Sequence, residues 1–180
     1  RFQIRGDMDN WPFLDGSGRF EAYAAVQGGR IDYLEGWPAA GGVDAFAHFV
    51  GASMDISGSV GDIGGVPVPS VQARIGNLKR PVLELDYRSS SDLPAYLGFV
   101  RQTPLLERLE TDLTEFTFAG PARTRGTISV PLGRAKGQRQ LSVDGEVTIE
   151  DGLFSDPLSE VTLSHIAGDL AYDENGFKGS

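Results

Sequence analysis

Apolar and polar residues alternate with a period of two along most of this chain, as in strands with one buried and one solvated face. Residues 19–27 follow the pattern, and residues 30–34 repeat it. Gly28-Gly29 is expected to form the turn between them, because residues without a Cβ adopt positive φ at little cost. Gly36-Trp37-Pro38 then breaks the run, since proline cannot donate to a strand ladder.

Two segments in the first half depart from simple alternation. Residues 43–50 are apolar on much of both faces, with Phe46 and Val50 opposite the main apolar positions, so this strand is expected to be covered on both sides. Residues 61–69 hold three glycines and two prolines. This composition predicts a loop or an irregular edge.

The second half contains the clearest amphipathic strand, residues 141–150, with Gly145 in its inward row. Asp151-Gly152 is expected to turn the chain, and residues 153–154 begin the return. The same order of amphipathic strand, glycine turn and second strand occurs at residues 22–31. This weak repeat predicts hairpins that add to one long sheet.

The period changes once, after residue 88. Ser89–Asp92 offers capping oxygens, and the apolar residues that follow have helical spacing; they are Leu93, Tyr96, Leu97 and Val100. Thr103-Pro104 can begin a second short helix, with proline at the first helical position. A helical pair is therefore predicted at about residues 92–110.

These elements predict a mainly β fold: a long, curved antiparallel sheet of repeated hairpins with one short helical pair. We expect one unit, with strands in residues 1–88, the helical pair in 89–112 and strands again in 113–180. A helical pair spans at most about 27 Å, whereas about ten strands extend nearly 50 Å, so the helices cannot cover the apolar face. The sheet must either fold on itself or curl into an apolar trough. The residues expected to line the trough are Phe20, Ala22, Ala24, Val26, Ile31, Tyr33, Met54, Ile56, Leu83, Leu85, Ile128, Val130, Leu141, Val143, Val147 and Ile149.

Composition narrows the classes of partner. The net charge is −9, from 25 acidic and 16 basic residues, which disfavours nucleic-acid binding. There are no cysteines, so disulfides and thiolate metal sites are excluded, while cytosol and periplasm both remain possible. No apolar run reaches the roughly 18 residues of a membrane span. Because the chain starts at Arg1, we expect it to be a fragment of a larger protein.

Enzyme chemistry has little support in the sequence. The two histidines, His48 and His165, lack a recognisable partner pattern and are expected to be structural. The acidic residues of 144–150 fit a solvated outer face better than a carboxylate site. We therefore expect no catalytic site, metal or cofactor. Trp11 and Trp37 each precede proline, which favours corner packing, with a place at the rim of the trough as the alternative.

Several motifs in roughly residues 1–135 resemble the conserved block of the YhdP family, large AsmA-like proteins of the bacterial envelope. The most specific is the Trp-Pro corner that follows a tyrosine. The matching segments are Phe13, Gly18-Arg19-Phe20, Ala22, Val26, Gly28, Ile31-Asp32-Tyr33, Gly36-Trp37-Pro38, Val43, Phe49, Met54-Asp55-Ile56, Gly65-Val66-Pro67-Val68, Val71-Gln72-Ala73-Arg74-Ile75 and Thr103-Pro104-Leu105.

This resemblance implies a segment of a β-groove that crosses the periplasm and conducts phospholipids between inner and outer membranes. The implied partners are phospholipid acyl chains, held in the groove with head groups outside, and neighbouring segments of the same chain. The full-length protein would be anchored in the inner membrane. The alternative is a closed β scaffold or interaction domain of a large envelope protein that binds no lipid. An open apolar trough would favour the conduit, and a filled two-layer core would favour the scaffold.

Overall fold

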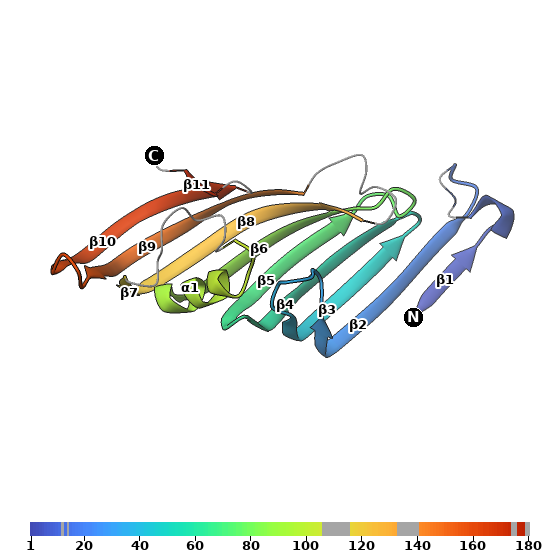
Figure 1. Ribbon diagram of the computed structural model, residues 1–180. Coiled ribbons are helices and arrows are strands. Elements are labelled where there is room, and N and C mark those ends of the chain that lie inside the picture. Colours follow the sequence, from blue (N-terminus) through green and yellow to red (C-terminus); the bar gives the residue numbers. More distant parts are fainter. Residues whose placement is uncertain (12, 14, 106–115, 133–140, 174–175, 179–180) are drawn as a thin grey trace.

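The computed structural model describes residues 1–11, 13, 15–105, 116–132, 141–173 and 176–178, and the chain there forms one antiparallel sheet with a single α-helix (Figure 1). The strands are β1 (Phe2–Arg5), β2 (Arg19–Ile31), β3 (Ala40–Val50), β4 (Ser53–Ile63), β5 (Val66–Ile75), β6 (Val82–Asp92), β7 (Thr117–Ala119), β8 (Pro121–Pro131), β9 (Ser142–Asp156), β10 (Val161–Asp173) and β11 (Gly176–Lys178). A 3-10 helix covers Met8–Asn10, and α1 covers Leu93–Arg101.

Each long strand pairs with its neighbours in the sequence, in the order β1-β2-β3-β4-β5-β6-β8-β9-β10-β11, with β7 beside β9. The two edge strands, β1 and β11, lie at opposite ends of a single curved layer (Figure 1). At about 4.8 Å per strand, the layer extends about 43 Å across its ten ordered strands. The predicted fold class, a long open sheet of antiparallel hairpins, is confirmed.

The register gives the sheet one apolar and one polar face. In β3 and β4, for example, Ala47 lies opposite Ile56 and the next pair joins His48 to Asp55. The alternation continues into β8 and β9, where Ile128 pairs with Val143 and Thr127 pairs with Asp144. Because successive side chains point to opposite faces, this in-register pairing carries the apolar set across the whole sheet.

Helix α1 begins where the sequence predicts it. Asp92 is the N-cap, and its carboxylate accepts a hydrogen bond of 2.9 Å from the backbone N–H of Ala95. The serines before it do not take part in the cap, because β6 continues through Ser89, Ser90 and Ser91 and pairs with β8. The second predicted helix lies mostly outside the described residues; Thr103, at its start, follows α1 directly in a turn.

The β2–β3 connection, residues 32–39, packs against α1. The ring of Trp37 lies 6.0 Å from that of Phe99 on the helix and 6.4 Å from that of Tyr33. The side-chain amide of Gln102 donates to the Gly64 carbonyl in the β4–β5 turn at 3.1 Å. Connection and helix together form a cover over one end of the strands, and the predicted corner packing of Trp37 is part of it.

Two predicted glycine turns are β-bulges instead. Strand β2 runs without a break from Arg19 to Ile31, and its pairing with β3 shifts register around Gly28-Gly29, where Gly28 has φ of 60°. Strand β9 likewise passes through Asp151-Gly152, beside a register shift in β10. The positive φ of Gly28 suits a hairpin turn and a bulge equally well, and the partner strand decides between them.

Two further expectations are corrected. Residues 61–69 are not a loop, because β4 continues to Ile63, Gly64-Gly65 makes a tight turn with positive φ at both residues, and β5 begins at Val66. Strand β3 is not covered on its second face by any described residue. Phe46 and Val50 there are 47% and 44% exposed.

Buried side chains are few and mostly small. The buried apolar residues among those described are Phe13, Ala40, Val43, Ala52, Val66, Ala73, Ile75 and Ala122, and none of the large described side chains is fully buried. No described helix is long and apolar enough to cross a membrane. The described chain is thus a single layer with a partial cover, and its apolar face lacks a closed core.

Candidate functional site: the apolar face of the sheet

An unbroken row of apolar side chains crosses seven neighbouring strands, from β2 to β9. Each member pairs in register with the next, so the row is fixed by the backbone ladder. We call it the central apolar row. It consists of Ala24, Ala47, Ile56, Ala73, Leu85, Ile128 and Val143.

A second apolar row runs parallel to the first, two residues along each strand. It consists of Ala22, Phe49, Met54, Ile75, Leu83 and Val130. The two rows therefore present a hydrocarbon strip about 7 Å wide between their centres, at 3.4 Å per residue. No charged side chain belongs to either row.

Most residues predicted to line a trough lie on this face. Phe20, Val147 and Ile149 share the parity of the two rows in their strands, and Val26 follows Ala24 on the same side. Three predicted residues lie outside the regular rows. Ile31 pairs with Ala40 beyond the bulge of β2, Tyr33 is in the β2–β3 connection, and Leu141 directly precedes β9.

None of the predicted lining residues is fully buried. Ala24, Val26, Ile31, Tyr33 and Leu141 are exposed, and the others are half-buried. A filled two-layer core would exclude water from most of them. Their partial exposure means that the described chain leaves this face accessible.

Sequence patterns missed part of the face. Strands β3 and β5 contribute Ala47, Phe49, Ala73 and Ile75, none of which was predicted as lining. The inward face of β3 was difficult to assign from the sequence, because Phe46 and Val50 give both faces of the strand apolar residues. Pairing with Ile56 and Met54, both predicted as lining, is the signal that assigns the side.

A third row differs in chemistry, and we call it the tyrosine row. It continues the pairing on the α1 side of the central apolar row and consists of Val26, Ala45, Gly58, Val71, Tyr87, Gly126, Gly145 and Tyr172. Gly126 and Gly145 lie between the two tyrosines. A Cβ on Gly145 would overlap the ring of Tyr172, and one on Gly126 would come within 3.0 Å of the Tyr87 hydroxyl. The rings therefore lean toward each other over bare backbone.

Five hydroxyl groups gather at this point, and we call them the hydroxyl cluster: Tyr87, Ser89, Tyr96, Thr124 and Tyr172. The Tyr87 and Tyr172 hydroxyls contact each other, and Thr124 Oγ1 lies 2.8 Å from the Tyr172 hydroxyl. Tyr96, on α1, donates to Ser89 Oγ at 3.0 Å, and Ser89 donates to the Pro67 carbonyl at 2.6 Å. Burial raises the pKa of Tyr87 and of Tyr96, so both phenols stay protonated.

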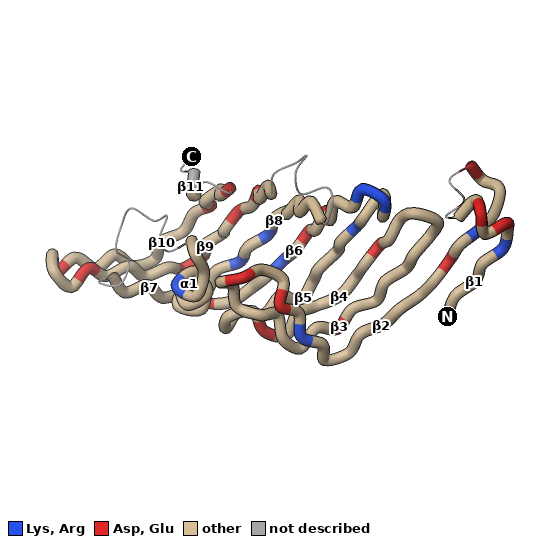
Figure 2. Tube along the Cα trace, turned by 45° about the vertical axis from the view of Figure 1, so that its right-hand side comes forward, with Lys and Arg blue, Asp and Glu red and all other residues tan. Residues whose placement is uncertain are grey.

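The opposite face carries the charges. Basic and acidic residues are distributed along the sheet (Figure 2), and cross-strand pairs join Arg125 to Glu146 at 2.9 Å and Arg123 to Glu150 at 2.8 Å. These pairs agree with the prediction that Glu146 and Glu150 lie on a solvated outer face. Exposed pairs of this kind contribute little to stability.

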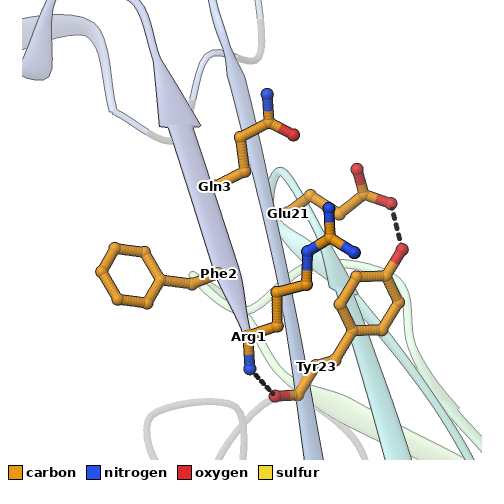
Figure 3. A pocket seen from close by; sticks show the side chains of 5 residues that line it. All are labelled: Arg1, Phe2, Gln3, Glu21 and Tyr23. Atoms are coloured by element: carbon orange, nitrogen blue, oxygen red, sulfur yellow. Dashed lines mark hydrogen bonds between the residues drawn. The ribbon is translucent and has the colours of Figure 1, made fainter.

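The polar face also holds a depression of about 370 Å³ at the β1–β2 edge (Figure 3). Glu21 lies there and accepts hydrogen bonds from the Tyr23 hydroxyl at 2.6 Å and from Arg19 at 2.6 Å. His48 Nε2 is 3.0 Å from the same carboxylate. The hydrogen bond from Tyr23 has the largest effect, and together these bonds lower the pKa of Glu21 to about 2. In Figure 3, Phe2 points to the other side of β1, away from this polar group.

Both histidines have partners on the sheet surface. His48 stacks on Tyr23 with ring centroids 4.5 Å apart, and His165 Nδ1 lies 2.9 Å from Asp151 Oδ1. The described residues include no group of three or more acidic, histidine or cysteine side chains that could hold a metal. The arrangement offers an extended apolar surface with one hydroxyl cluster.

Comparison with known proteins agrees with the motifs. The family model described as "YhdP protein" matches residues 1–180, which is more of the chain than the 1–135 over which the motifs carry the resemblance. Comparisons with curated proteins and with solved structures found no match. The match spans the whole chain, and the chain therefore belongs to the YhdP family, AsmA-like proteins of the bacterial envelope.

Proposed function

We propose that this chain is a segment of a periplasmic lipid conduit that holds phospholipid acyl chains against the apolar face of its sheet. The lipid moves between inner and outer membranes without chemical change, and the full-length protein is anchored in the inner membrane. Membership in a bacterial envelope family is compatible with this location. The acyl chains lie on the residues predicted to line the trough, above all those of the central apolar row.

The observation that carries the proposal is the central apolar row itself. It crosses seven paired strands from Ala24 to Val143 without a polar side chain. Its members are half-buried or exposed, apart from Ala73. Surface of this size and composition is unusual on a soluble protein and marks a binding face.

The free energy of exposing a lipid tail to water explains why an apolar surface is enough to carry a lipid. Exposing a lipid tail to water costs about 0.8 kcal/mol per CH₂, or on the order of 12 kcal/mol for a 16-carbon chain. A conduit avoids this cost by offering hydrocarbon contact at every step. Since the central apolar row has no charged or hydrogen-bonding anchor, a chain can slide along it from strand to strand.

The scaffold alternative is less well supported. A closed β domain requires a second layer against the apolar face. The described residues supply α1 and the β2–β3 connection at one end of the strands, and no large described side chain is fully buried. This open layer favours the conduit.

Native mass spectrometry of the purified chain, with lipid extraction from the same sample, tests the proposal. We expect phospholipid to accompany the wild-type chain. Val26→Asp and Val143→Asp place a carboxylate in the acyl path, and we expect each to lose the lipid while circular dichroism remains that of the wild type.

The adjacent residues provide matched controls on the same strands. Gln27→Asp and Ser142→Asp add the same charge at exposed positions next to the tested ones. We expect both to keep their lipid. A folded wild-type chain that carries no lipid and acquires none from vesicles would contradict the proposal and favour the scaffold.

A further inference from the structure

In the paired strands that the structure describes, the hydroxyl groups on the apolar face occur in one place. In the paired strands β2 to β5, the inward side chains of the three rows are apolar or glycine. In β6 to β10, the inward residues include Tyr87, Ser89, Ser91, Thr124 and Tyr172. All five lie within three consecutive inward rows, beside the central apolar row.

The cluster is built by long-range register. Tyr87 and Tyr172 are 85 residues apart in the chain, and β8 and β9 separate their strands. The hydroxyls meet because Gly126 and Gly145 leave the backbone between them uncovered. A surface that only had to repel water would be served equally well by phenylalanine at both positions.

Three of these residues keep part of their surface exposed to solvent. Tyr87, Thr124 and Tyr172 are half-buried, whereas Ser89 is buried and donates to the Pro67 carbonyl. A hydroxyl hydrogen rotates freely about its C–O bond, so these groups can bond one another or turn toward an acceptor above them. An acceptor in apolar surroundings would otherwise go without a partner, at a cost.

We propose that the hydroxyl cluster binds the ester carbonyl oxygens of acyl lipids whose hydrocarbon lies on the central apolar row. This inference rests on the proposed function and adds a position for the lipid: tails over the apolar rows, esters beside Tyr87, Thr124 and Tyr172. Ester carbonyls are strong acceptors with no donor of their own. The protonated phenol of Tyr87 supplies the complementary donor.

The test compares a diacyl phosphatidylethanolamine with its dialkyl ether analogue of the same chain length, which lacks the carbonyls. Both are offered in equal amounts in vesicles, and the lipid bound to the chain is counted by native mass spectrometry. One hydrogen bond is equivalent to about a fivefold preference. We expect the wild type to favour the ester by about that factor, and the double variant Tyr87→Phe, Tyr172→Phe to bind both lipids about equally.

Tyr23→Phe is the matched control, because it removes a phenol hydroxyl from a tyrosine on the polar face, where Tyr23 bonds Glu21. It should keep the wild-type ratio. Thr124→Val gives a second test if the double variant does not fold, and it should lower the ratio while leaving the tyrosine rings in place. Equal binding of the two lipids by the wild type, or an unchanged ratio in the cluster variants, would overturn the inference.

The counts of bound ester and ether lipid distinguish a failure of this inference from a failure of the proposed function on which it rests. If the wild type binds ester and ether lipids equally, lipid binding stands and the ester site is wrong. If the wild type binds neither lipid, both proposals are wrong.

Discussion

The two halves of the apolar face are built on the same ladder but differ in chemistry. From β2 to β5 the three inward rows present only hydrocarbon, with Gly58 as the one position lacking a side chain. From β6 onward the central apolar row continues to β9 and the second apolar row to β8, and the row beside them becomes Tyr87, Gly126, Gly145 and Tyr172. A continuous strip can therefore carry a local polar site without interruption, because the polar groups occupy a neighbouring row.

The glycines are what make the difference possible. Two tyrosines three strands apart can touch only if the residues between them have no side chains. The ring of Tyr172 lies over Gly145 and takes the place of a missing side chain. The same row in β2–β5 is filled by Val26, Ala45 and Val71, which keep that half purely apolar.

The largest expected effect comes from filling the space under Tyr172. Gly145→Ala places a Cβ in the volume of the ring, so the ring must leave the Tyr87 hydroxyl. Overpacking of this kind costs about 1–3 kcal/mol in the free energy of unfolding, which chemical denaturation measures. Gly168→Ala, on β10 with no heavy atom within 4 Å of the new Cβ, should change stability by less than about 0.5 kcal/mol. Equal effects of the two substitutions would show that the ring position does not matter.

A smaller effect is expected from removing the hydroxyls alone. The double variant Tyr87→Phe, Tyr172→Phe keeps both rings but loses their contact, and a half-buried hydrogen bond contributes about 1 kcal/mol. Tyr33→Phe changes a tyrosine outside the cluster and should leave the free energy of unfolding nearly unchanged in the same denaturation experiment. A double variant as stable as the wild type would contradict a contribution of these hydroxyls to the fold.

The smallest effect on the fold is expected on the polar face, where solvent competes for every bond. The pKa of Glu21 is lowered to about 2 from its usual 4.5. A lowered pKa in the folded state adds stability above pH 4.5, and that contribution is lost as the pH falls toward 2. Tyr23→Phe removes the first cause and should raise the pKa of Glu21 in a carboxyl NMR titration. A wild-type value near 4.5 would contradict the hydrogen bonds seen at this carboxylate.

The general fold was accessible from the sequence because alternation is local. The inward row of β9, with Val143, Gly145, Val147 and Ile149, was identified correctly, and Asp92 caps α1 as predicted. The structural roles of the glycines were harder to predict. Gly28-Gly29 and Asp151-Gly152 were predicted as turns and are bulges, because glycine suits both and the choice depends on the partner strand.

The hydroxyl cluster could not be predicted from local patterns. Its tyrosines were visible only as members of separate strands, and their contact depends on the register of four strands. One signal was present: Gly145 in an otherwise apolar inward row. A glycine there leaves a gap that some other side chain must fill, and Tyr172 fills it.

The most direct test of lipid binding by the apolar face uses two adjacent alanines of β2, both exposed and on opposite faces. Ala24 belongs to the central apolar row, and Ala25 lies on the polar face opposite Phe46. Ala24→Asp and Ala25→Asp have identical composition and charge, and bound phospholipid is counted per chain after incubation with vesicles. We expect at least a tenfold loss of bound phospholipid for Ala24→Asp and wild-type binding for Ala25→Asp. Equal binding by the two variants would contradict the claim that the apolar face of the sheet holds the lipid.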